Sequence, residues 1–332
     1  MKSLTGLSVF FLFLFSACQD ETSSEGGALP AIQISLPKAL QTFDASSART
    51  ANITVALADH MNNTLFQDKP YKVDKVWMYT TPDEVRSVET IDRQFESTLP
   101  SRWVSGDTRR NWNGDGDLTD IDYLAFSPLA IANGTIDAEP IYDAMYDKWE
   151  NEGTCTSLAI DKTPYDLSMG SPSLILNFGP SLPSTGNPLA DISVVGFVPA
   201  SIMEAVLGSE NVLGVAFSFT FIDEAGEATK STRGKDDRAY TEIWFNDGYT
   251  WGTEPAPGVI DLESVILHEA GHSLVLGHFG ILQEILEDGE RVDLVYQPVN
   301  TMNALYIGED RGFLGPNDKG NYCENWGAWP YN

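Results

Sequence analysis

Histidine and basic residues are both scarce in this sequence. Its 332 residues include four histidines, and 20 lysines and arginines stand against 48 aspartates and glutamates, for a formal net charge of −28 at pH 7. A surface of this sign repels the phosphate backbone, so we expect no nucleic-acid partner. The acidity suits a secreted protein that binds calcium, although by itself it more often reflects only a solvated surface.

Long hydrophobic runs are missing too, but general disorder is excluded. Hydrophobic residues make up 42% of the chain and aromatic residues 11%, which is enough for a substantial core. The sequence contains no internal repeat. We therefore expect one large globular domain with an N-terminal extension, working as a monomer.

An apolar run near the N-terminus, residues 7–15, is too short for a comfortable transmembrane helix. It follows Lys2 and leads into small residues and Cys18, an order typical of an export signal. The letters "FSAC" resemble the bacterial lipobox, which implies a signal peptide over residues 1–17 and a lipid on Cys18, the only expected contact with a membrane. The protein would then lie in the cell envelope, at the outer membrane or the cell surface. Phe15 stands where that pattern prefers leucine, so ordinary cleavage with secretion, or a retained anchor, remains open.

Three further segments follow the signal. Residues 18–50 are rich in Ser, Thr, Ala and Gly and predict a flexible tether. Residues 51–99 form an N-terminal extension whose role the sequence does not define. In it, "ANITVALAD" and "DKVWMYTT" alternate as β-strands do. Residues 100–332 form the main domain.

The main domain begins with a helix, continues with several strands and returns to a helix. "TIDAEPIYDAMYDKWENEG" places Met145 and Trp149 at helical spacing. Strand-length apolar runs follow, among them "ADISVVGFVP", "VLGVAFSFTFID" and "AYTEIWFND". "IDLESVILHEAGHSLVL" then predicts a second helix with Asp261 as its N-cap. This order predicts an α+β fold with one mixed sheet.

Three of the four histidines lie within "HEAGHSLVLGH", residues 268–278. Residues four apart share one face of a helix, so His268 and His272 can hold one metal ion, to which His278 adds a third ligand. Glu269 beside them suits a general base that takes a proton from metal-bound water. A solvated helix face or a set of core histidines is the alternative, but the apolar neighbours favour a metal. We expect Zn²⁺.

With its third histidine, this stretch resembles the matrixin-like branch of the metzincin metalloproteases, whose consensus is H-E-x-x-H-x-x-G-x-x-H followed by a methionine turn. The resemblance runs from about residue 100 to the C-terminus. "ADISVVGF" and "TEIWFNDGYTW" resemble strands ahead of the active-site helix, "VNTMNALY" a methionine turn at Met302, and "LGPNDKGNYCENW" the start of the last helix. Outside such a context, a methionine is more often a gap filler in a core.

The resemblance implies a metzincin-like fold, with a mixed twisted sheet, a long active-site helix and a C-terminal helix after the methionine turn. It also implies a zinc-dependent endopeptidase acting on protein or peptide substrates, with Zn²⁺ on His268, His272 and His278 and with Glu269 as the general base. The competing hypothesis is a non-catalytic surface lipoprotein that binds glycan or protein around a structural zinc. Glu269 favours the enzyme, because a structural zinc site does not need it.

Two features depart from the matrixin pattern. Val275 occupies the position of the family's glycine, where the chain turns toward the third ligand. We expect Gly277 to make this turn instead, because a glycine just past a helix readily takes the left-handed conformation. No cysteine-switch motif precedes the domain, so any latency must have another mechanism.

The sequence has only three cysteines. If Cys18 carries a lipid, Cys155 and Cys323 remain, and an oxidising compartment favours a disulfide between them. Two unrelated buried thiols are the alternative.

Residues 111–122, "NWNGDGDLTDID", have the rhythm of a calcium-binding loop. Side-chain oxygens fall at the first, third, fifth, ninth and twelfth positions, with glycine at the sixth. The loop resembles the dockerin-type EF-hand loop, although no convincing helix enters it and Asp-Gly runs are also ordinary turns. The candidate Ca²⁺ ligands are Asn111, Asn113, Asp115, Thr119 and Asp122.

Overall fold

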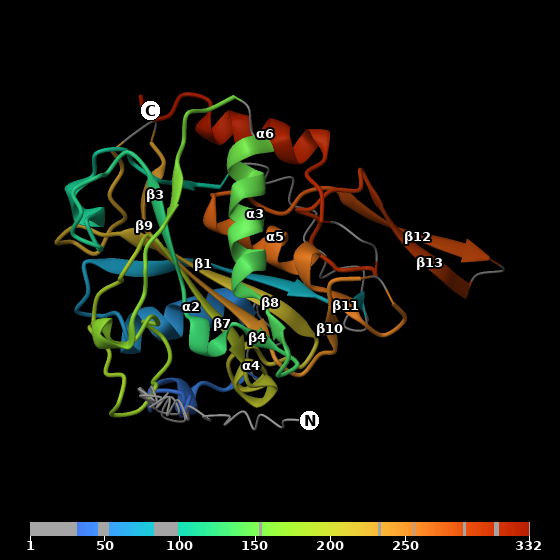
Figure 1. The fold of residues 1–332 in the computed structure, drawn as a ribbon, viewed down its shortest axis with the longest axis horizontal. Helices are drawn as coiled ribbons and strands as arrows, with labels where there is room; N and C mark the ends of the chain where they lie inside the picture. The colour runs from blue at the N-terminus through green and yellow to red at the C-terminus, as the bar shows by residue number, and fades with distance from the viewer. Residues whose placement is uncertain are drawn as a thin grey trace, which may run out of the picture. The chain divides into compact units, whose positions relative to one another are not determined.

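The computed structural model (Figure 1) describes most of the chain from Ile32 onward. The described residues are 32–45, 53–82, 99–152, 155–231, 234–254, 256–287, 290–308 and 312–331. The predicted signal peptide, residues 1–17, and the predicted lipidation site Cys18 lie outside them. Within the described residues, no helix has both the length and the hydropathy needed to cross a bilayer.

A mixed, twisted β-sheet forms the centre of the fold, as predicted. Its strands, in spatial order, are β1 (Tyr71–Thr80), β8 (Val212–Phe221), β9 (Asp236–Asn246), β7 (Ile192–Val198), β3 (Ile121–Ala125) and β6 (Ile160–Lys162), with β2 (Ser101–Arg102) beside the start of β9. β1 and β8 are antiparallel, as are β8 and β9. From β9 onward the strands β7, β3 and β6 run parallel.

Helices cover both faces of this sheet. The α-helices of the described residues are α2 (Ile53–Thr64), α3 (Glu139–Glu152), α4 (Ala200–Leu207), α5 (Leu262–Ser273) and α6 (Pro316–Trp326). α3, α5 and α6 pack on one face, and α2 and α4 pack on the other. Successive residues of β8 point to opposite faces, so Val215 joins the α2 side and Ala216 the α5 side. The predicted α+β class is therefore confirmed.

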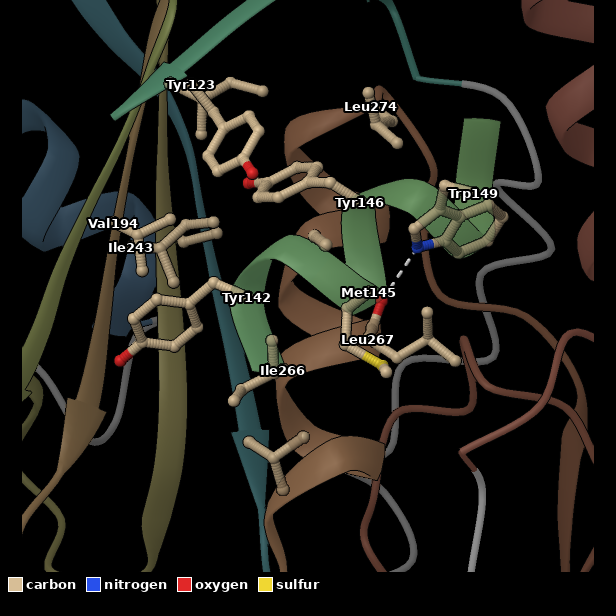
Figure 2. Packing of buried hydrophobic residues seen from close by; sticks show 14 of the residues in the cluster. Tyr123, Tyr142, Met145, Tyr146, Trp149, Val194, Ile243, Ile266, Leu267 and Leu274 are labelled. Carbon is tan, nitrogen blue, oxygen red and sulfur yellow. Dashed lines mark hydrogen bonds between the residues drawn. The ribbon is translucent and has the colours of Figure 1, made fainter. Parts of the chain in front are cut away.

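The core on the α5 side is rich in aromatic residues (Figure 2). Tyr142, Tyr146 and Trp149 of α3 are all buried there. The Trp149 indole Nε1 donates a hydrogen bond to the Leu267 carbonyl oxygen at 3.0 Å. This bond fixes α3 against α5, the helix that carries the histidines.

Shorter elements connect these layers. β4 (Ile131–Ala132) pairs with β5 (Ile136–Asp137), β10 (Trp251–Gly252) with β11 (Ile260–Asp261), and β12 (Ile281–Glu287) with β13 (Glu290–Gln297). The β12–β13 hairpin extends away from the sheet (Figure 1). Among the described residues, the 3-10 helices are η1 (Leu40–Thr42), η3 (Thr108–Arg110), η4 (Ser127–Leu129) and η5 (Leu167–Met169).

The described residues of the N-terminal extension, 53–82 and 99, form one helix and one strand, where two strands were predicted. "DKVWMYTT" lies largely in β1, as predicted, but "ANITVALAD" begins α2. The buried residues of α2 are Leu57, Ala58 and Met61, a helical spacing, whereas Val55 is 55% exposed. The alternation of apolar residues in this segment is therefore incidental.

Two predicted boundaries are wrong. Residues 32–45 fall within the predicted tether, yet Leu40 is 2% exposed and Ser35 exchanges backbone hydrogen bonds with Asn177 at 2.9 and 3.0 Å. The main domain does not begin at residue 100 either, because β1 belongs to the same sheet as β3 and β7. The compact unit comprises residues 32–332.

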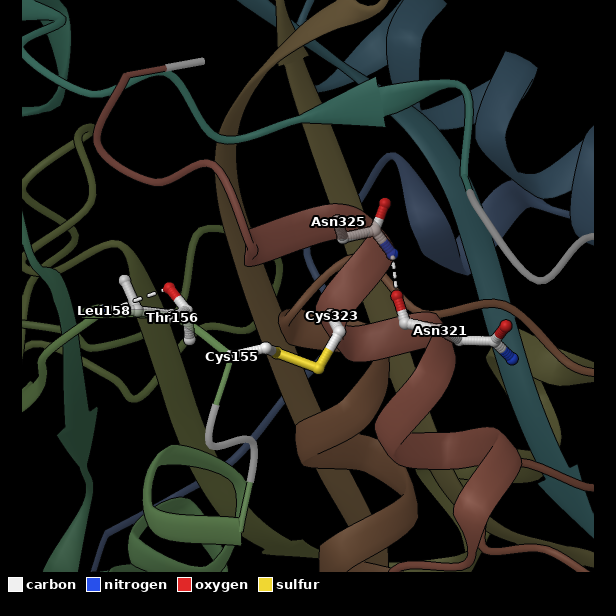
Figure 3. Close-up of a disulfide and its surroundings, with 6 residues drawn as sticks. All are labelled: Cys155, Thr156, Leu158, Asn321, Cys323 and Asn325. Atoms are coloured by element: carbon white, nitrogen blue, oxygen red, sulfur yellow. Dashed lines mark hydrogen bonds between the residues drawn. A yellow bond between two sulfur atoms is a disulfide. The ribbon is translucent and has the colours of Figure 1, made fainter.

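Cys155 and Cys323 form a disulfide (Figure 3). Their Cα atoms are 5.6 Å apart, within the range such a bond spans. The disulfide joins α6 to the segment that follows α3.

Candidate metal centre

The three clustered histidines converge on one point. His268 Nε2 lies 3.0 Å from His272 Nε2 and 3.1 Å from His278 Nε2, and the remaining pair is 3.0 Å apart. Zn–N bonds are about 2.0–2.1 Å long, and a triangle of this size leaves a point at that distance from all three nitrogens. The group can therefore hold a metal ion.

Backbone carbonyls fix the orientation of two of these rings. His268 Nδ1 lies 2.7 Å from the Thr301 carbonyl oxygen, and His272 Nδ1 lies 2.8 Å from the Leu276 carbonyl oxygen. Because a carbonyl only accepts hydrogen bonds, each Nδ1 carries the proton and donates it. Each Nε2 then directs a lone pair at the shared point, which is the tautomer that a metal ligand needs.

Burial also favours the neutral form of two of these imidazoles, those of His272 and His278. It lowers the pKa of His272 well below its ordinary value, and the two neighbouring histidines lower it further. Burial lowers the pKa of His278 to about 3. Neutral rings whose lone pairs face one another are stabilised by a shared cation and not by added protons.

The chain turns toward His278 at Val275, not at Gly277. Val275 has a φ of 61°, in the left-handed region, whereas Gly277 is not among the residues with positive φ. The Leu276 amide donates to the Gly271 carbonyl oxygen at 3.0 Å, which closes a helix end of the left-handed kind. The prediction for Gly277 is therefore wrong. Val275 is 1% exposed, and this burial offsets a backbone strain of about 1–3 kcal/mol.

Asp318, at the start of α6, supports the ring of His268 indirectly. Its carboxylate accepts hydrogen bonds from the Thr301 amide at 3.0 Å and the Met302 amide at 3.3 Å. It thereby holds the segment whose carbonyl orients His268. Sequence reasoning missed Asp318, although an aspartate in the first turn of a helix is a known capping signal.

Met302 lies against α5, beside the histidines. It is 1% exposed, and its sulfur lies so close to Gly271 that a β-carbon there would collide with it. The predicted methionine therefore packs directly on the helix that carries His268 and His272.

Glu269 is fully buried between α5 and β8. A β-carbon at Gly214 would fall 2.7 Å from Glu269 Oε1 and 2.9 Å from its Cγ, so a larger residue there would displace the Glu269 side chain. Within the described residues, neither carboxylate oxygen of Glu269 has a hydrogen-bond partner. Burial raises the pKa of Glu269 well above its ordinary value. A carboxyl group perturbed in this way is typical of proton-transfer sites.

Two aromatic side chains of β1 cover the histidine rings. Trp77 stacks on His272, with centroids 4.8 Å apart and planes 14° apart, and Tyr79 stacks on His268 at 3.8 Å and 9°. Sequence reasoning predicted the strand but not this contact, because alternation shows that a segment is extended without showing which helix it meets.

The predicted calcium loop brings together three carboxylates. Oxygen atoms of Asp115, Asp120 and Asp122 lie within 4.8 Å of one another. Asp120 was not among the predicted ligands. Thr119 was, but its hydroxyl donates to Asp117 Oδ1 at 2.8 Å.

The two asparagines predicted as ligands form hydrogen bonds within the loop. Asn113 Nδ2 donates to Asp115 Oδ2 at 2.8 Å and to Asp122 Oδ2 at 2.6 Å, and Asn111 Oδ1 accepts from the Gly116 amide at 3.1 Å. Burial, together with neighbouring carboxylates, raises the pKa of Asp122 to about 7. Protons would therefore compete with any cation for the carboxylates of this loop.

No protein-family model matches the chain, and no curated protein matches it significantly. Function is therefore argued from the chemistry of the centre.

Proposed function

We propose that the protein is a zinc-dependent endopeptidase of the matrixin-like, metzincin kind. The observation that carries this proposal is the triangle of three Nε2 atoms, 3.0–3.1 Å apart, from His268, His272 and His278. It is supported by Glu269, whose buried carboxylate lies on the same helix, one residue from His268.

The number of ligands favours catalysis over a structural role for the metal. Among the described histidines, cysteines, aspartates and glutamates, no fourth side chain joins the three histidines. Structural zinc sites have four protein ligands, whereas catalytic sites have three and keep one position open. Imidazole donors suit zinc.

Different residues of the chain would have different roles in peptide hydrolysis. The histidine rings hold the metal, and the Thr301 and Leu276 carbonyls keep those rings in the ligand tautomer. Zinc, when bound, would acidify a water molecule and polarise the scissile carbonyl. Glu269 would accept the proton of that water and deliver it to the leaving amine. A nearby dication favours the charged carboxylate, so it opposes the effect of burial on the Glu269 pKa.

The arrangement after the third histidine also supports this class. Met302 packs on α5, and Asp318 of the following helix holds the Met302 and Thr301 amides. A methionine turn followed by a C-terminal helix is the order that the sequence resemblance implies.

We further propose that the protein is exported, as a lipoprotein through Cys18 or as a secreted protein, and that residues 111–122 bind Ca²⁺ as a second cofactor. The disulfide between Cys155 and Cys323 suits an oxidising compartment. The carboxylates of Asp115, Asp120 and Asp122 suit a hard cation.

Glu269→Gln tests the enzymatic role, with Glu263→Gln in the first turn of the same helix as the matched control. We expect both variants to hold one zinc per chain, measured by elemental analysis. Cleavage of a mixed peptide library should fall by at least about 100-fold in Glu269→Gln alone, because only that variant loses the proton acceptor. Zinc binding without cleavage by the unmodified chain, or by any activated form of it, would instead indicate a binding protein with a non-catalytic metal.

A further inference from the structure

Strand β1 lies between two other segments of the metal centre. Along its length it pairs antiparallel with β8. At its end, Thr80 forms a parallel bridge with Leu305, and the Tyr306 amide donates to the Thr80 carbonyl oxygen at 2.9 Å. β1 thus runs between β8, which carries Gly214 against Glu269, and the segment that follows Met302.

The part of β1 nearest the metal centre is Trp77 to Tyr79. Trp77 stacks on His272 and meets His278 edge-on at 5.3 Å, and Tyr79 stacks on His268. Tyr79 pairs in register with Gly214, the residue that touches the Glu269 carboxylate. This short stretch of main chain therefore lies beside both the three histidines and the proposed general base.

Irregular pairing brackets this stretch. The register between β1 and β8 shifts between Val73 and Lys75, and again between Tyr79 and Thr80. Such bulges are common beside active sites, where they re-aim side chains. Here they direct Trp77 and Tyr79 toward the histidines, while Met78 between them packs on the α2 side of the sheet.

An extended peptide commonly binds a protein by adding a strand to the edge of a sheet. Beside the metal centre the edge strand of the sheet is β1, and without β1 that edge would be β8. We propose that β1 occupies the edge of β8 at which a peptide substrate would pair. Substrate then reaches the metal only when β1 leaves β8. This proposal rests on the proposed peptidase function. It gives the N-terminal extension a role and supplies a form of latency that needs no cysteine.

A disulfide staple tests whether β1 must move. Met78 and Val215 are paired in register and pack on the α2 side of the sheet. Facing residues of antiparallel strands have Cα atoms about 4.5–5.5 Å apart, a separation that a disulfide spans. Met78→Cys/Val215→Cys in the full chain should therefore lock β1 to β8 when oxidised. The single variants and the unmodified chain, taken through the same redox cycle, control for reduction of Cys155–Cys323.

Three quantities are measured on each form: zinc per chain, affinity for a peptide hydroxamate by calorimetry, and cleavage of a peptide library. Only molecules in which β1 has left β8 can bind a peptide ligand along β8. We therefore expect the oxidised staple to weaken hydroxamate affinity by at least about 10-fold relative to its reduced form. Zinc content should not change. An oxidised staple that binds and cleaves as well as the reduced form would overturn the proposal.

Trp77→Ala/Tyr79→Ala provides an independent test. It should raise hydroxamate affinity and cleavage per zinc above those of the unmodified chain, because it loosens β1 from the centre. If the two rings are instead permanent supports of the ligands, zinc content will fall and activity with it, which also overturns the proposal. If hydroxamate affinity depends on whether the staple is oxidised but no form cleaves peptides, occlusion by β1 is supported and the peptidase function is rejected.

Discussion

The histidine centre and the loop of residues 111–122 both bring three ionisable side chains within reach of one cation, but they do so by different means. The histidines come from α5 and the turn after it, and carbonyls of Thr301 and Leu276 set two of their rings. In the loop, Asn113 bonds Asp115 and Asp122 within one short segment. The centre depends on packing between distant segments. The loop combines such local hydrogen bonds with a few from distant segments, such as the one that the Thr163 hydroxyl donates to Asp122 Oδ1 at 3.3 Å.

This difference has an electrostatic consequence. Burial holds the imidazoles of His272 and His278 neutral, and His268 and His272 donate their Nδ1 protons to carbonyls, so the metal competes with few protons near neutral pH. In the loop, burial and then neighbouring carboxylates raise the pKa of Asp122 and Asp120, so a cation that enters the loop must displace protons. We therefore expect strong, pH-insensitive zinc binding near neutral pH and weaker, pH-sensitive calcium binding.

The largest expected effect removes one member of the triangle. His278→Ala should weaken zinc binding by more than about 100-fold, because loss of even an outer-shell partner costs about 10–100-fold. The measurement is zinc retention against a graded chelator. His60→Ala is the matched control, since His60 Nε2 contacts the Ala39 carbonyl oxygen, away from the centre. Zinc held as tightly by His278→Ala as by the unmodified chain would show that the third ligand lies elsewhere.

Local patterns in the sequence predicted the elements better than their contacts. Asp261 caps α5 as predicted, with its Oδ2 accepting from the Ser264 amide at 2.9 Å, because capping depends on neighbours in sequence. The helical spacing of Met145 and Trp149 likewise predicted α3. The contact of Trp77 with His272 joins segments far apart in the chain, and no local pattern carries that information.

Burial also overrode local preference at particular residues. Glycine is the usual choice for a left-handed residue, so Gly277 was the reasonable prediction for the turn. Val275 takes that role because its side chain fills the core beside α5. Asp120 was passed over as a calcium ligand because the loop's rhythm skips its position, yet the fold turns its carboxylate toward Asp115.

A smaller effect tests the proton competition in the loop. Burial raises the pKa of Asp122 to about 7 and that of Asp120 to about 6. At pH 8 both groups are ionised, and at pH 6 Asp122 is mostly protonated. Calcium affinity should therefore fall on the order of 10-fold between pH 8 and pH 6.

Calorimetry on the zinc-loaded protein, in buffers of different ionisation enthalpy, measures both this affinity and the protons released. Asp122→Asn should lose much of the pH dependence, whereas Asp166→Asn, an exposed aspartate that caps η5, should keep it. Calcium affinity that is equal at the two pH values would remove the proposed contrast between the sites.

The smallest effect concerns the backbone strain at Val275, where the chain turns toward His278. Val275 is buried with a φ of 61°, where alanine is disfavoured by about 1–2 kcal/mol relative to glycine. Val275→Gly and Val275→Ala both delete the branched side chain, and glycine loses one further methyl group, worth roughly 0.8 kcal/mol. We therefore expect Val275→Gly to be more stable to denaturant than Val275→Ala by about 0.5–1 kcal/mol.

The sign of this difference is the diagnostic feature. At an exposed position inside a helix, such as Asp147 of α3, alanine is the more stable by about 1 kcal/mol. The glycine and alanine variants at both positions are measured at fixed zinc concentration. This comparison separates the effect of the left-handed backbone from a general effect of glycine. If alanine is also the more stable residue at position 275, the turn toward His278 is not left-handed there, and the packing of Val275 does not offset a strained backbone.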